Sequence, residues 1–590
     1  MSQRPPTPSR LAEPVAREIA AAFGEYREGF LEVTRRARER FERREWGRLR
    51  ADSTLRLGLY RASVDRAEAA TRALLGERCR DRIVWISAKA VYSSLIAQRQ
   101  DWELAETFFN SVTRRLFSTV GVDPTMEYVA SDFDAPPSEA LEPVYERYPG
   151  RLPVVEMITR VLRKAPISVT WVDLESDAAL VAERIGAHLA AKGASRVASL
   201  EVIRPLFFQG KAAYVVGRLL LPAGAVVPIA LALRHGPRGA RVDAVMLERN
   251  ELSMLFSFTR SYFHVDVERP YDVMRFLRSL VPKKPIAELY IAIGEVKQGK
   301  TELYRALVDH LAETPERFCF APGIPGLVMI VFTAPGLDFV LKIIRDDFPP
   351  QKDISPAKVR ERYGWVYTQD RAGRLVDAQE FEHLVFPRDR FEPDLLAELI
   401  SSAGRTVRVQ GDRVHVDLAW VERKLTPLNI FVRKVPAERA IFALGEYARA
   451  IRDLAACDIF PGDLLLKNFG VTRHGRVALY DYDELVELTS ITFRDIPEAR
   501  RPEEEASAEP FFAVGAHDVF PEEFARFLGL PERLRAPLLE TYPEIFTAAW
   551  WRRMQAQVRT GKVREFPPYP PERRLRPAEV TPPEAAAGVP

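Results

Sequence analysis

Residues Pro461-Gly-Asp463-Leu-Leu-Leu-Lys467-Asn468-Phe-Gly-Val-Thr-Arg-His-Gly-Arg-Val-Ala-Leu-Tyr-Asp481-Tyr-Asp483 decide the fold of the second half of the chain. Asp463 and Asn468 are five residues apart (468 − 463 = 5), the spacing of the Asp and Asn in the protein-kinase motif H-R-D-x-x-x-x-N. Asp481 ends an apolar strand, as the Asp of the kinase D-F-G segment does. Pro-Gly replaces His-Arg, and Asp-Tyr-Asp replaces D-F-G.

The residue types in this segment indicate phosphoryl transfer. In kinases the catalytic-loop Asp accepts the proton of the substrate hydroxyl, and the Asn binds magnesium. Lys467 is well placed in the sequence to meet a transferred phosphoryl group. Asn468 and Asp481 offer oxygen ligands from neighbouring strand ends, which suits Mg²⁺. Taken singly, the two pieces would also fit unrelated surface turns.

A glycine-containing loop lies further upstream, between the predicted strands Glu316–Phe320 and Leu327–Thr333. With Ala in the first place, its sequence matches the kinase pattern G-x-G-x-x-G-x-V. Glycines let a backbone approach phosphates closely, although Gly/Pro turns between strands are common. The loop consists of Ala321, Pro322, Gly323, Ile324, Pro325, Gly326 and Leu327, followed by Val328.

Lys342 lies inside the apolar predicted strand Asp338–Ile344. A buried ammonium requires a partner, so we expect this lysine to bind a phosphate or a carboxylate. Its position resembles the lysine of the kinase V-A-I-K strand. A snorkelling lysine on an edge strand is the alternative. The sequence leaves its carboxylate partner open among Glu361, on the predicted helix Pro356–Gln369, and Glu380 and Glu382, on the predicted helix Ala378–Leu384.

A further strand, Arg413–Trp420, alternates apolar and polar residues. The sequence Trp420-Val-Glu422-Arg-Lys424 follows it. In a kinase this is where the hinge presents backbone groups to adenine, so we expect Glu422 and Lys424 at the nucleotide.

One motif points to another enzyme class. Gly294-Glu-Val-Lys-Gln-Gly299-Lys300-Thr301 matches the P-loop pattern G-x-x-x-x-G-K-[ST]. A P-loop needs a strand directly before it, whereas the preceding apolar residues have helical spacing. We therefore expect one helix to end near Gly299 and another to begin near Thr301. A P-loop NTPase and a non-catalytic pseudokinase scaffold remain the alternative functions.

Length and patterning predict an α+β protein with two large domains. The 590 residues allow roughly 4 domains at about 150 residues each, or fewer large ones. We expect a mostly helical domain over 1–312 with a small antiparallel sheet, a kinase-like domain over 313–566, and a Pro-rich flexible tail over 567–590. The strands expected in the first domain are Val197–Pro205, Ala212–Leu221, Val226–Arg234 and Gly239–Leu247; the main helices are Leu11–Phe23, Gly29–Trp46, Val64–Leu75, Ala88–Phe117 and Ser176–Ala191.

The charge balance and the cysteines narrow the class of protein. Lys+Arg number 85 and Asp+Glu 82, a net charge of +3, which argues against a nucleic-acid coat protein. The three cysteines form no C-x-x-C pair, so we expect a reducing compartment. The N-terminus lacks an apolar signal-peptide region, and the apolar stretch Leu219–Leu233 is too short to span a membrane. We expect a β-hairpin there.

The sequence from Pro461 to Glu484 resembles the isocitrate dehydrogenase kinase/phosphatase family, as do Ala321–Ile330, Gln379–Glu382 and Pro427–Ile430. This resemblance implies a bilobal protein-kinase-like domain behind a helical regulatory domain. It implies a bacterial enzyme that phosphorylates a serine of isocitrate dehydrogenase and removes the phosphate again. That reaction controls flux between the tricarboxylic acid cycle and the glyoxylate bypass.

The resemblance also assigns roles to single residues. It makes Ala321–Leu327 the ATP loop, Lys342 the ligand of the α/β-phosphates and Asp463 the catalytic base, with Asp483 assisting Asn468 and Asp481 at Mg²⁺ or Mn²⁺. Asp377 matches a carboxylate linked to the phosphatase reaction, whereas the sequence alone favours a helix N-cap there. The family further implies AMP as an effector. Independently of the family, we expect a cytoplasmic location without nucleic-acid or membrane partners; the sequence leaves the oligomeric state open, with a homodimer as one candidate.

Overall fold

The computed structural model divides the chain into two compact units. Unit 1 comprises residues 1–258, 262–303 and 567–590, and unit 2 comprises 259–261 and 304–566. The described residues are 7–118, 121–129, 142–222, 224–257, 262–350, 352, 354–369, 373–497, 512–561 and 566–577. The boundary at 303/304 lies nine residues before the expected 312/313 (312 − 303 = 9).

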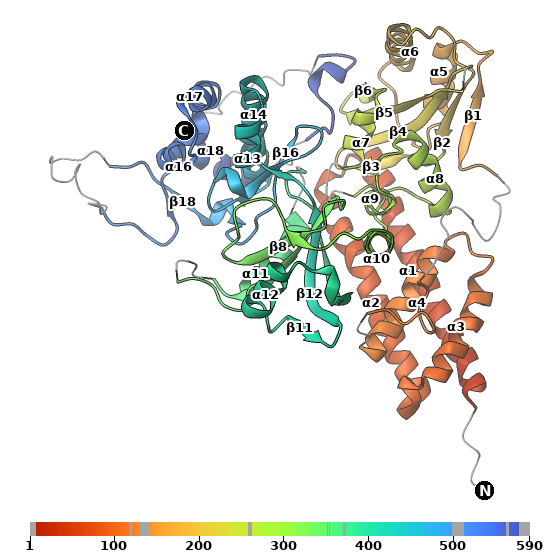
Figure 1. The fold of residues 1–590 in the computed structure, drawn as a ribbon. Helices are drawn as coiled ribbons and strands as arrows, with labels where there is room; N and C mark the ends of the chain where they lie inside the picture. The colour runs from red at the N-terminus through yellow and green to blue at the C-terminus, as the bar shows by residue number, and fades with distance from the viewer. Residues whose placement is uncertain are drawn as a thin grey trace, which may run out of the picture. The chain divides into compact units, whose positions relative to one another are not determined.

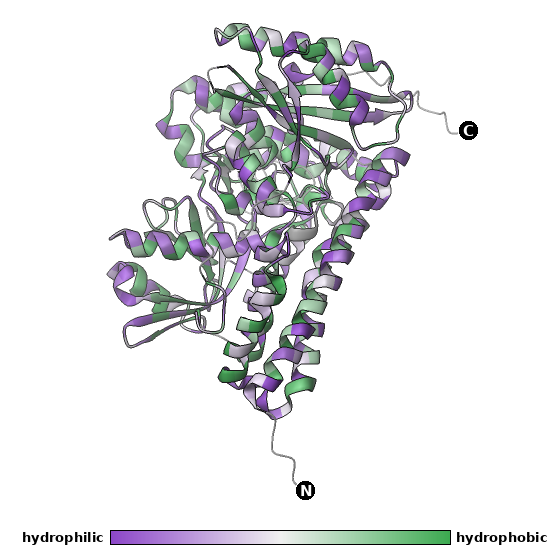
Figure 2. Cartoon of the chain, turned by 90° about the vertical axis from the view of Figure 1, so that its right-hand side faces the viewer, coloured by the Kyte–Doolittle hydropathy of each residue, from purple (hydrophilic) through white to green (hydrophobic). Residues whose placement is uncertain are grey.

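Unit 1 begins with long amphipathic helices (Figures 1 and 2). The two helices expected at Leu11–Phe23 and Gly29–Trp46 are one helix of 36 residues, which ends where Arg44 adopts a left-handed conformation. The expected helix Ala88–Phe117 is two helices, separated at Ala97–Asp101. Their apolar faces share one core, in which Phe23, Trp85 and Phe108 are fully buried. These helices are α1 (Pro8–Arg43), α2 (Leu49–Leu75), α3 (Arg82–Ile96) and α4 (Trp102–Phe117).

An antiparallel sheet follows, and it confirms the four strands expected from the period-2 pattern. Its order is β1-β2-β4-β5-β6, with β3 paired to β4. The apolar stretch Leu219–Leu233 lies in the hairpin β4–β5, as expected. The strands are β1 (Tyr145–Pro149), β2 (Ser199–Ile203), β3 (Phe207–Gln209), β4 (Ala212–Leu220), β5 (Val226–Gly236) and β6 (Gly239–Met246).

Helices pack against both faces of this sheet and bury its apolar side chains in two separate clusters. One cluster includes residues of α5 and α6, and the other includes residues of α7, α8 and α9. The helices are α5 (Val154–Lys164), α6 (Leu174–Ala191), α7 (Arg249–Leu255), α8 (Pro270–Leu280) and α9 (Ile286–Ala292).

The P-loop hypothesis is wrong. The chain turns at Gly294, and Gly299, Lys300 and Thr301 lie inside helix α10 (Val296–Glu313), with helix α9 before them instead of a strand. The helix break therefore comes five residues earlier than expected. A Cβ on Gly299 would lie 2.6 Å from the carbonyl oxygen of Ala287, so this glycine serves close helix packing.

The first part of unit 2 is a sheet in the order β10-β12-β9-β8-β7, with β11 paired to β12. The expected helix Ala378–Leu384 is wrong, because this segment lies in strand β10, which pairs with β12 at nine positions. Glu380 is exposed while Phe381 is buried, an alternation that suits a strand. The elements are β7 (Cys319–Phe320), β8 (Met329–Thr333), β9 (Phe339–Ile344), β10 (Ala378–Pro387), β11 (Val407–Gln410), β12 (Arg413–Arg423), α11 (Pro356–Gln369) and α12 (Pro393–Ser402).

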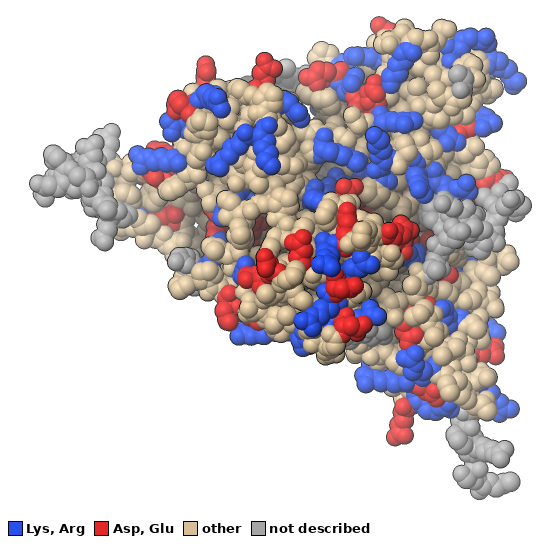
Figure 3. Space-filling model, in the orientation of Figure 1, with Lys and Arg blue, Asp and Glu red and all other residues tan. Residues whose placement is uncertain are grey.

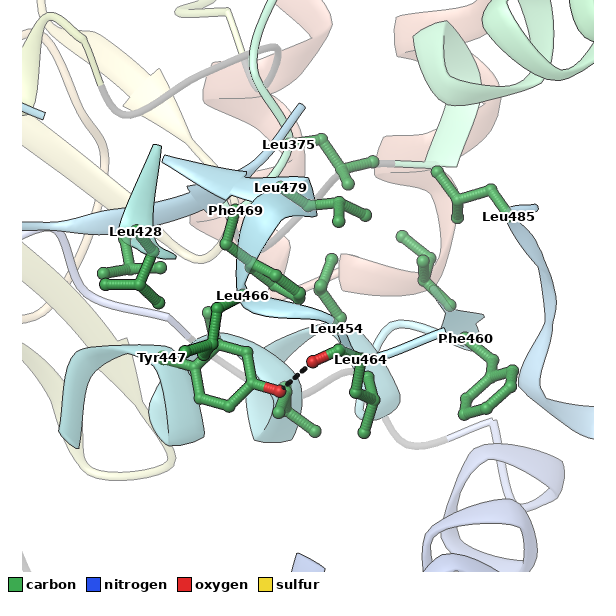
Figure 4. Close-up of a cluster of buried hydrophobic side chains, with 14 of the residues drawn as sticks. Leu375, Leu428, Tyr447, Leu454, Phe460, Leu464, Leu466, Phe469, Leu479 and Leu485 are labelled. Atoms are coloured by element: carbon green, nitrogen blue, oxygen red, sulfur yellow. Dashed lines mark hydrogen bonds between the residues drawn. The ribbon is translucent and has the colours of Figure 1, made fainter. Parts of the chain in front are cut away.

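The second part of unit 2 is mostly helical around the short sheet β13-β15-β16. Its helices and strands surround a large apolar cluster, part of which Figure 4 shows. The elements are β13 (Thr426–Pro427), α13 (Leu428–Lys434), α14 (Ala437–Ala455), β14 (Ile459–Phe460), β15 (Phe469–Val471), β16 (Val477–Leu479), β17 (Val486–Glu487), β18 (Thr492–Phe493), β19 (Asp518–Val519), α16 (Phe524–Phe527), α17 (Glu532–Thr541) and α18 (Ala548–Arg559). Together the two parts confirm the bilobal α+β architecture.

The Pro-rich end differs from the flexible tail expected at 567–590, as far as the structure describes it. Tyr569 is buried in the core of unit 1, and its hydroxyl donates to Oδ2 of Asp243 at 2.7 Å. Arg576 forms an ion pair with the buried Asp177. Apolar burial and charge pairing hold residues 567–577, whereas 578–590 lie outside the described residues.

The surface agrees with the balanced composition. On the face shown in Figure 3, basic and acidic side chains are interspersed. Among the described residues, no helix combines the length and apolar character needed to cross a membrane.

Candidate active site

Lys342 lies on the central strand β9 and is buried, with 4% of its surface exposed. Its Nζ lies 2.7 Å from Oε2 of Glu422 and donates to the carbonyl oxygen of Tyr480 at 2.7 Å. Trp420 pairs directly with Lys342, so Glu422, two residues further along β12, faces the same side of the sheet. The edge-strand alternative is therefore wrong, and the carboxylate partner is Glu422.

The three carboxylates that the sequence left open do not take this place. Glu380 and Glu382 lie on strand β10, and Glu361 forms an exposed ion pair with Lys358. The sequence did not point to Glu422 as the partner of Lys342. The register between the neighbouring strands β9 and β12 brings the two residues together, and this register cannot be read from local sequence.

The hairpin β15–β16 brings Asn468 and Asp481 to the same end. Phe469 pairs with Leu479, and just beyond this pair the amide of Tyr480 donates to the carbonyl oxygen of Asn468 at 3.0 Å. Asp481 follows directly. The carbonyl oxygen of Tyr480 also accepts a hydrogen bond from Lys342. Lys342, Asn468 and Asp481 therefore belong to one site.

The side chain of Asn468 is held in a fixed orientation. Its Nδ2 donates to Oδ1 of Asp463, and its Oδ1 is buried without a hydrogen-bond partner among the described residues. A buried amide oxygen normally has a partner, so this atom fits a cation ligand.

The carboxylate of Asp463 is held by two groups that follow it in the chain, the side chain of Asn468 and the amide of Leu465. Its Oδ1 also accepts from the amide of Leu465 at 3.1 Å. Leu464 and Leu466 lie in the apolar cluster near Tyr447 and Phe469, as Figure 4 shows, and the Tyr447 hydroxyl donates to the Leu464 carbonyl. Burial, together with the charge of Glu484, raises the pKa of Asp463 above its usual value.

The Pro-Gly that replaces His-Arg has a structural cause. Gly462 has φ +85°, and a Cβ there would lie 2.6 Å from the carbonyl oxygen of Glu484. Only glycine tolerates both conditions. The close approach brings the segment Asp481–Glu484 against the loop that carries Asp463.

Asp481 and Asp483 form the acidic end of the hairpin. Burial, followed by the negative charge of Asp483, raises the pKa of Asp481 to about 7, and Lys342 opposes this shift. Oδ2 of Asp483 lies 2.8 Å from Nζ of Lys352, a residue that sequence reasoning missed. Two carboxylates that repel each other in this way would gain from a cation between them.

The candidate metal ligands do not form an all-protein cage. The described residues contain no group of three His, Cys, Asp or Glu side chains arranged to hold a metal. An Asn, one or two Asp and substrate phosphates are nevertheless an ordinary magnesium environment. Asn468, Asp481 and Asp483 therefore fit a metal that binds together with a nucleotide.

Lys467 lies on the short helical turn Leu466–Asn468, directly before Asn468 in the chain. Its charge lowers the pKa of Asp463, although burial and Glu484 outweigh it. The hydroxyl of Tyr480 donates to the carbonyl oxygen of Lys467, which fixes the backbone of this turn.

The loop Ala321–Leu327 connects β7 to β8, and Pro322 to Leu327 are exposed. Its two ends are fixed: the Ala321 amide donates to the Val331 carbonyl at 3.0 Å, and Arg345 Nε donates to the Gly326 carbonyl at 3.1 Å. Gly323, Ile324 and Pro325 form the exposed middle of the loop, where backbone can close over a ligand.

Glu422 and Lys424, the two residues that the sequence predicted at the nucleotide, contact different groups. The ammonium of Lys424 donates to the carbonyl oxygens of Pro335 and Leu337, each at 3.2 Å. The backbone amide of Lys424 donates to the carbonyl oxygen of Asp338 at 2.8 Å. The structure therefore does not bring its side chain to the other site residues. Glu422 is in the site, but through its carboxylate and Lys342.

Asp377 precedes strand β10, so the helix N-cap reading is wrong. Its Oδ2 accepts from Nε2 of Gln379 at 2.6 Å. Leu375, two residues before it, forms a parallel bridge with Leu479, two residues before Asp481. The segment that carries Asp377 thus runs alongside the strand that ends in Asp481.

A broad surface concavity of about 1010 Å³ lies elsewhere in unit 2, between β10, α12 and β12. Arg388, Phe391, Ile400 and Arg413 line it, and none of the site residues predicted from the sequence does.

Comparison with known proteins covers almost the whole chain. The family model described as isocitrate dehydrogenase kinase/phosphatase (AceK) kinase domain matches residues 316–571, and the one described as the regulatory domain of the same protein matches residues 16–315.

Curated relatives carry the same name, isocitrate dehydrogenase kinase/phosphatase. The relative from Anaeromyxobacter sp. (strain Fw109-5) is 46% identical over 569 residues, which cover 96% of this chain and 99% of that protein. The relative from Anaeromyxobacter dehalogenans (strain 2CP-C) is 46% identical over 578 residues, covering 96% and 98%. That from Xanthomonas campestris pv. campestris (strain 8004) is 41% identical over 577 residues, covering 97% and 99%.

Proposed function

Because this chain belongs to the isocitrate dehydrogenase kinase/phosphatase family, we propose that it phosphorylates a serine of isocitrate dehydrogenase with ATP and removes the phosphate again. ATP and a divalent metal follow from the kinase activity, and we propose Mg²⁺, with Mn²⁺ able to replace it. The reaction would direct carbon between the tricarboxylic acid cycle and the glyoxylate bypass, in the cytoplasm.

One continuous set of contacts carries the proposal. Lys342 Nζ binds the Tyr480 carbonyl, the Tyr480 amide binds the Asn468 carbonyl, and the Asn468 side chain binds Asp463. These residues come from a strand of the first part of unit 2 and a hairpin and loop of the second. Such convergence is what a phosphoryl-transfer site needs, because its catalysis is mostly positioning and charge neutralisation.

In the kinase direction Asp463 would orient the serine hydroxyl and accept its proton. Its carboxylate is already held by the Leu465 amide and the Asn468 side chain, so little reorganisation is needed. A pKa raised by burial makes it a stronger proton acceptor than an exposed aspartate. Lys342 and Lys467 would neutralise the phosphates, and Ala321–Leu327 would cover them.

Asn468 and Asp481 would hold the metal, with Asp483 assisting. The support is the buried Oδ1 of Asn468, which has no hydrogen-bond partner among the described residues, together with two mutually repelling carboxylates at the same end of the hairpin. When bound, the divalent ion supplies positive charge to the β- and γ-phosphate oxygens.

For the phosphatase direction we propose that Asp377 orients the attacking water. The support is its place at the end of a segment that runs parallel to the strand before Asp481. Gln379 donates to one carboxylate oxygen of Asp377 and so fixes the direction of the other. A second carboxylate on this side would let the same pocket run both reactions.

We also propose AMP as an effector acting through unit 1, and a homodimer as the assembly. Equilibrium binding of AMP to the purified protein and sedimentation velocity test these two points separately.

The function is tested by incubating the chain with isocitrate dehydrogenase and γ-labelled ATP. Label should appear on the target and leave again when ATP is replaced by unlabelled ADP. Lys342→Ala should abolish ATP binding, whereas the matched Lys300→Ala, on helix α10, should retain it. An unlabelled target would refute the kinase assignment, and the absence of any metal-dependent ATP turnover would favour the pseudokinase scaffold.

A further inference from the structure

Lys352 lies between strand β9 and helix α11, outside any helix or strand. Its Nζ lies 2.8 Å from Oδ2 of Asp483 and also hydrogen-bonds Oε1 of Glu484. The side chain is 17% exposed, so the ammonium is partly shielded from water. Neither the motifs of the sequence nor the proposed mechanism uses this residue.

The ammonium of Lys352 pairs directly with Asp483 at the acidic end of the hairpin and with the neighbouring Glu484. Burial would lower the pKa of Lys352, but the hydrogen bonds with Asp483 and Glu484 raise it, so the group stays charged. Its charge also lowers the pKa of both Asp463 and Asp481. One lysine thus counters four carboxylates that converge on the site.

Lys342 cannot do the same for Asp483. Its ammonium is held by Glu422 and the Tyr480 carbonyl on a central strand. Lys352, in contrast, can withdraw without breaking a strand ladder, because it lies outside the secondary structure. It also occupies one of the two carboxylate oxygens that Asp483 could offer to a metal.

We propose that Lys352 is an internal cation that occupies the acidic end of the hairpin and that the divalent metal must displace. It is a positioning residue that lowers the affinity of the nucleotide-free protein for the metal. The inference rests on the proposed function, because it takes Asp481 and Asp483 as metal ligands. A site kept occupied in this way would bind the metal chiefly as its nucleotide complex, whose phosphates add ligands.

The test measures Mn²⁺ binding to the full chain without nucleotide, by electron paramagnetic resonance of the free ion. Lys352→Met removes the charge and keeps the length of the side chain. It should bind Mn²⁺ at least about tenfold more tightly, because a like charge next to the ion is gone. Lys352→Arg, which keeps the cation, and Lys358→Met, which removes an exposed lysine paired with Glu361, should bind as the parent protein does.

Unchanged or weaker Mn²⁺ binding by Lys352→Met would overturn the inference. Asp481→Asn separates this failure from failure of the proposed function. If Asp481→Asn loses Mn²⁺ and Lys352→Met does not gain it, the inference alone fails. If Asp481→Asn binds Mn²⁺ as before, the metal assignment fails and takes the inference with it. Near-ultraviolet circular dichroism of each variant checks that the fold is retained.

Discussion

The buried ammonium of Lys342 lies 2.7 Å from Oε2 of Glu422, a residue of the adjacent strand. In protein kinases the corresponding lysine pairs with a glutamate of a helix, so movement of that helix can break the pair. Here the register of β9 and β12 holds both partners. The ion pair is therefore built into the sheet and does not depend on where helix α11 lies.

Glu422→Ala should destabilise unit 2 by about 3–5 kcal/mol, because it leaves the buried Lys342 ammonium without its carboxylate. Chemical denaturation followed by tryptophan fluorescence measures the change. Glu361→Ala is the matched control, since its exposed pair with Lys358 should contribute less than about 1 kcal/mol. Equal stabilities of the two variants would contradict the assignment of Glu422 as the partner.

Asp481→Ala should abolish both the kinase and the phosphatase reaction, because both depend on the metal in the proposed mechanism. We expect a loss of about a hundredfold to a thousandfold in each rate, comparable to the removal of a main electrostatic stabiliser. Label transfer to and from isocitrate dehydrogenase measures both. Asp412→Ala, at a 90% exposed side chain, is the control. A fully active Asp481→Ala would refute the metal assignment.

Asp377→Ala should lose the phosphatase reaction and retain the kinase reaction, since only the former needs an oriented water. Gln379→Ala should reduce the phosphatase rate less, because it removes only the hydrogen bond that directs Asp377. The exposed Glu380→Ala, on the same strand, serves as the control. Retention of both reactions by Asp377→Ala excludes the proposed role.

Ending the chain at residue 566 should lower the melting temperature of unit 1. The shortened chain loses the buried Tyr569, its hydrogen bond to Asp243 and the ion pair of Arg576 with Asp177. Differential scanning calorimetry measures the effect, which we expect to be at least about 5 °C. A chain that ends at 577 keeps these contacts and is the matched control. If both shortened chains melt alike, the end segment does not stabilise unit 1.

The free energy of unfolding of unit 1 should fall as the pH rises, because Glu103 is buried and its carboxyl group loses its proton. Burial raises the pKa of this glutamate to about 8, and its Oε2 has no hydrogen-bond partner among the described residues. The folded state therefore holds the proton more tightly than the unfolded state, so the associated stability is present at low pH and is lost as the pH rises to about 8.

Glu103→Gln should remove this dependence. Its melting temperature should exceed that of the parent protein by an amount that grows from about pH 5 to about pH 8 and then levels off. Glu32→Gln, at an exposed helix position, is the control and should show no such trend. A difference that is constant with pH would show that Glu103 is not protonated in the folded state.

Local patterns in the sequence predicted that Asn468 and Asp481 lie at neighbouring strand ends, and the hairpin β15–β16 is consistent with this. The turn at Gly475 and the short apolar strands on both sides lie within 15 residues, so chain geometry alone brings them together. The same kind of pattern failed for Ala378–Leu384. Ala, Glu and Leu favour a helix locally, and only the pairing of β10 with β12 makes this segment a strand.

By itself, the sequence determined the order of the kinase-like segments, the family resemblance and the residue types available for phosphoryl transfer, since these depend on neighbours along the chain. The tertiary structure decided that Glu422 holds Lys342, that Lys352 faces Asp483 and that Tyr569 completes the core of unit 1. Each of these contacts joins residues set by strand register or by the closure of a long loop, and no local propensity of the chain specifies them.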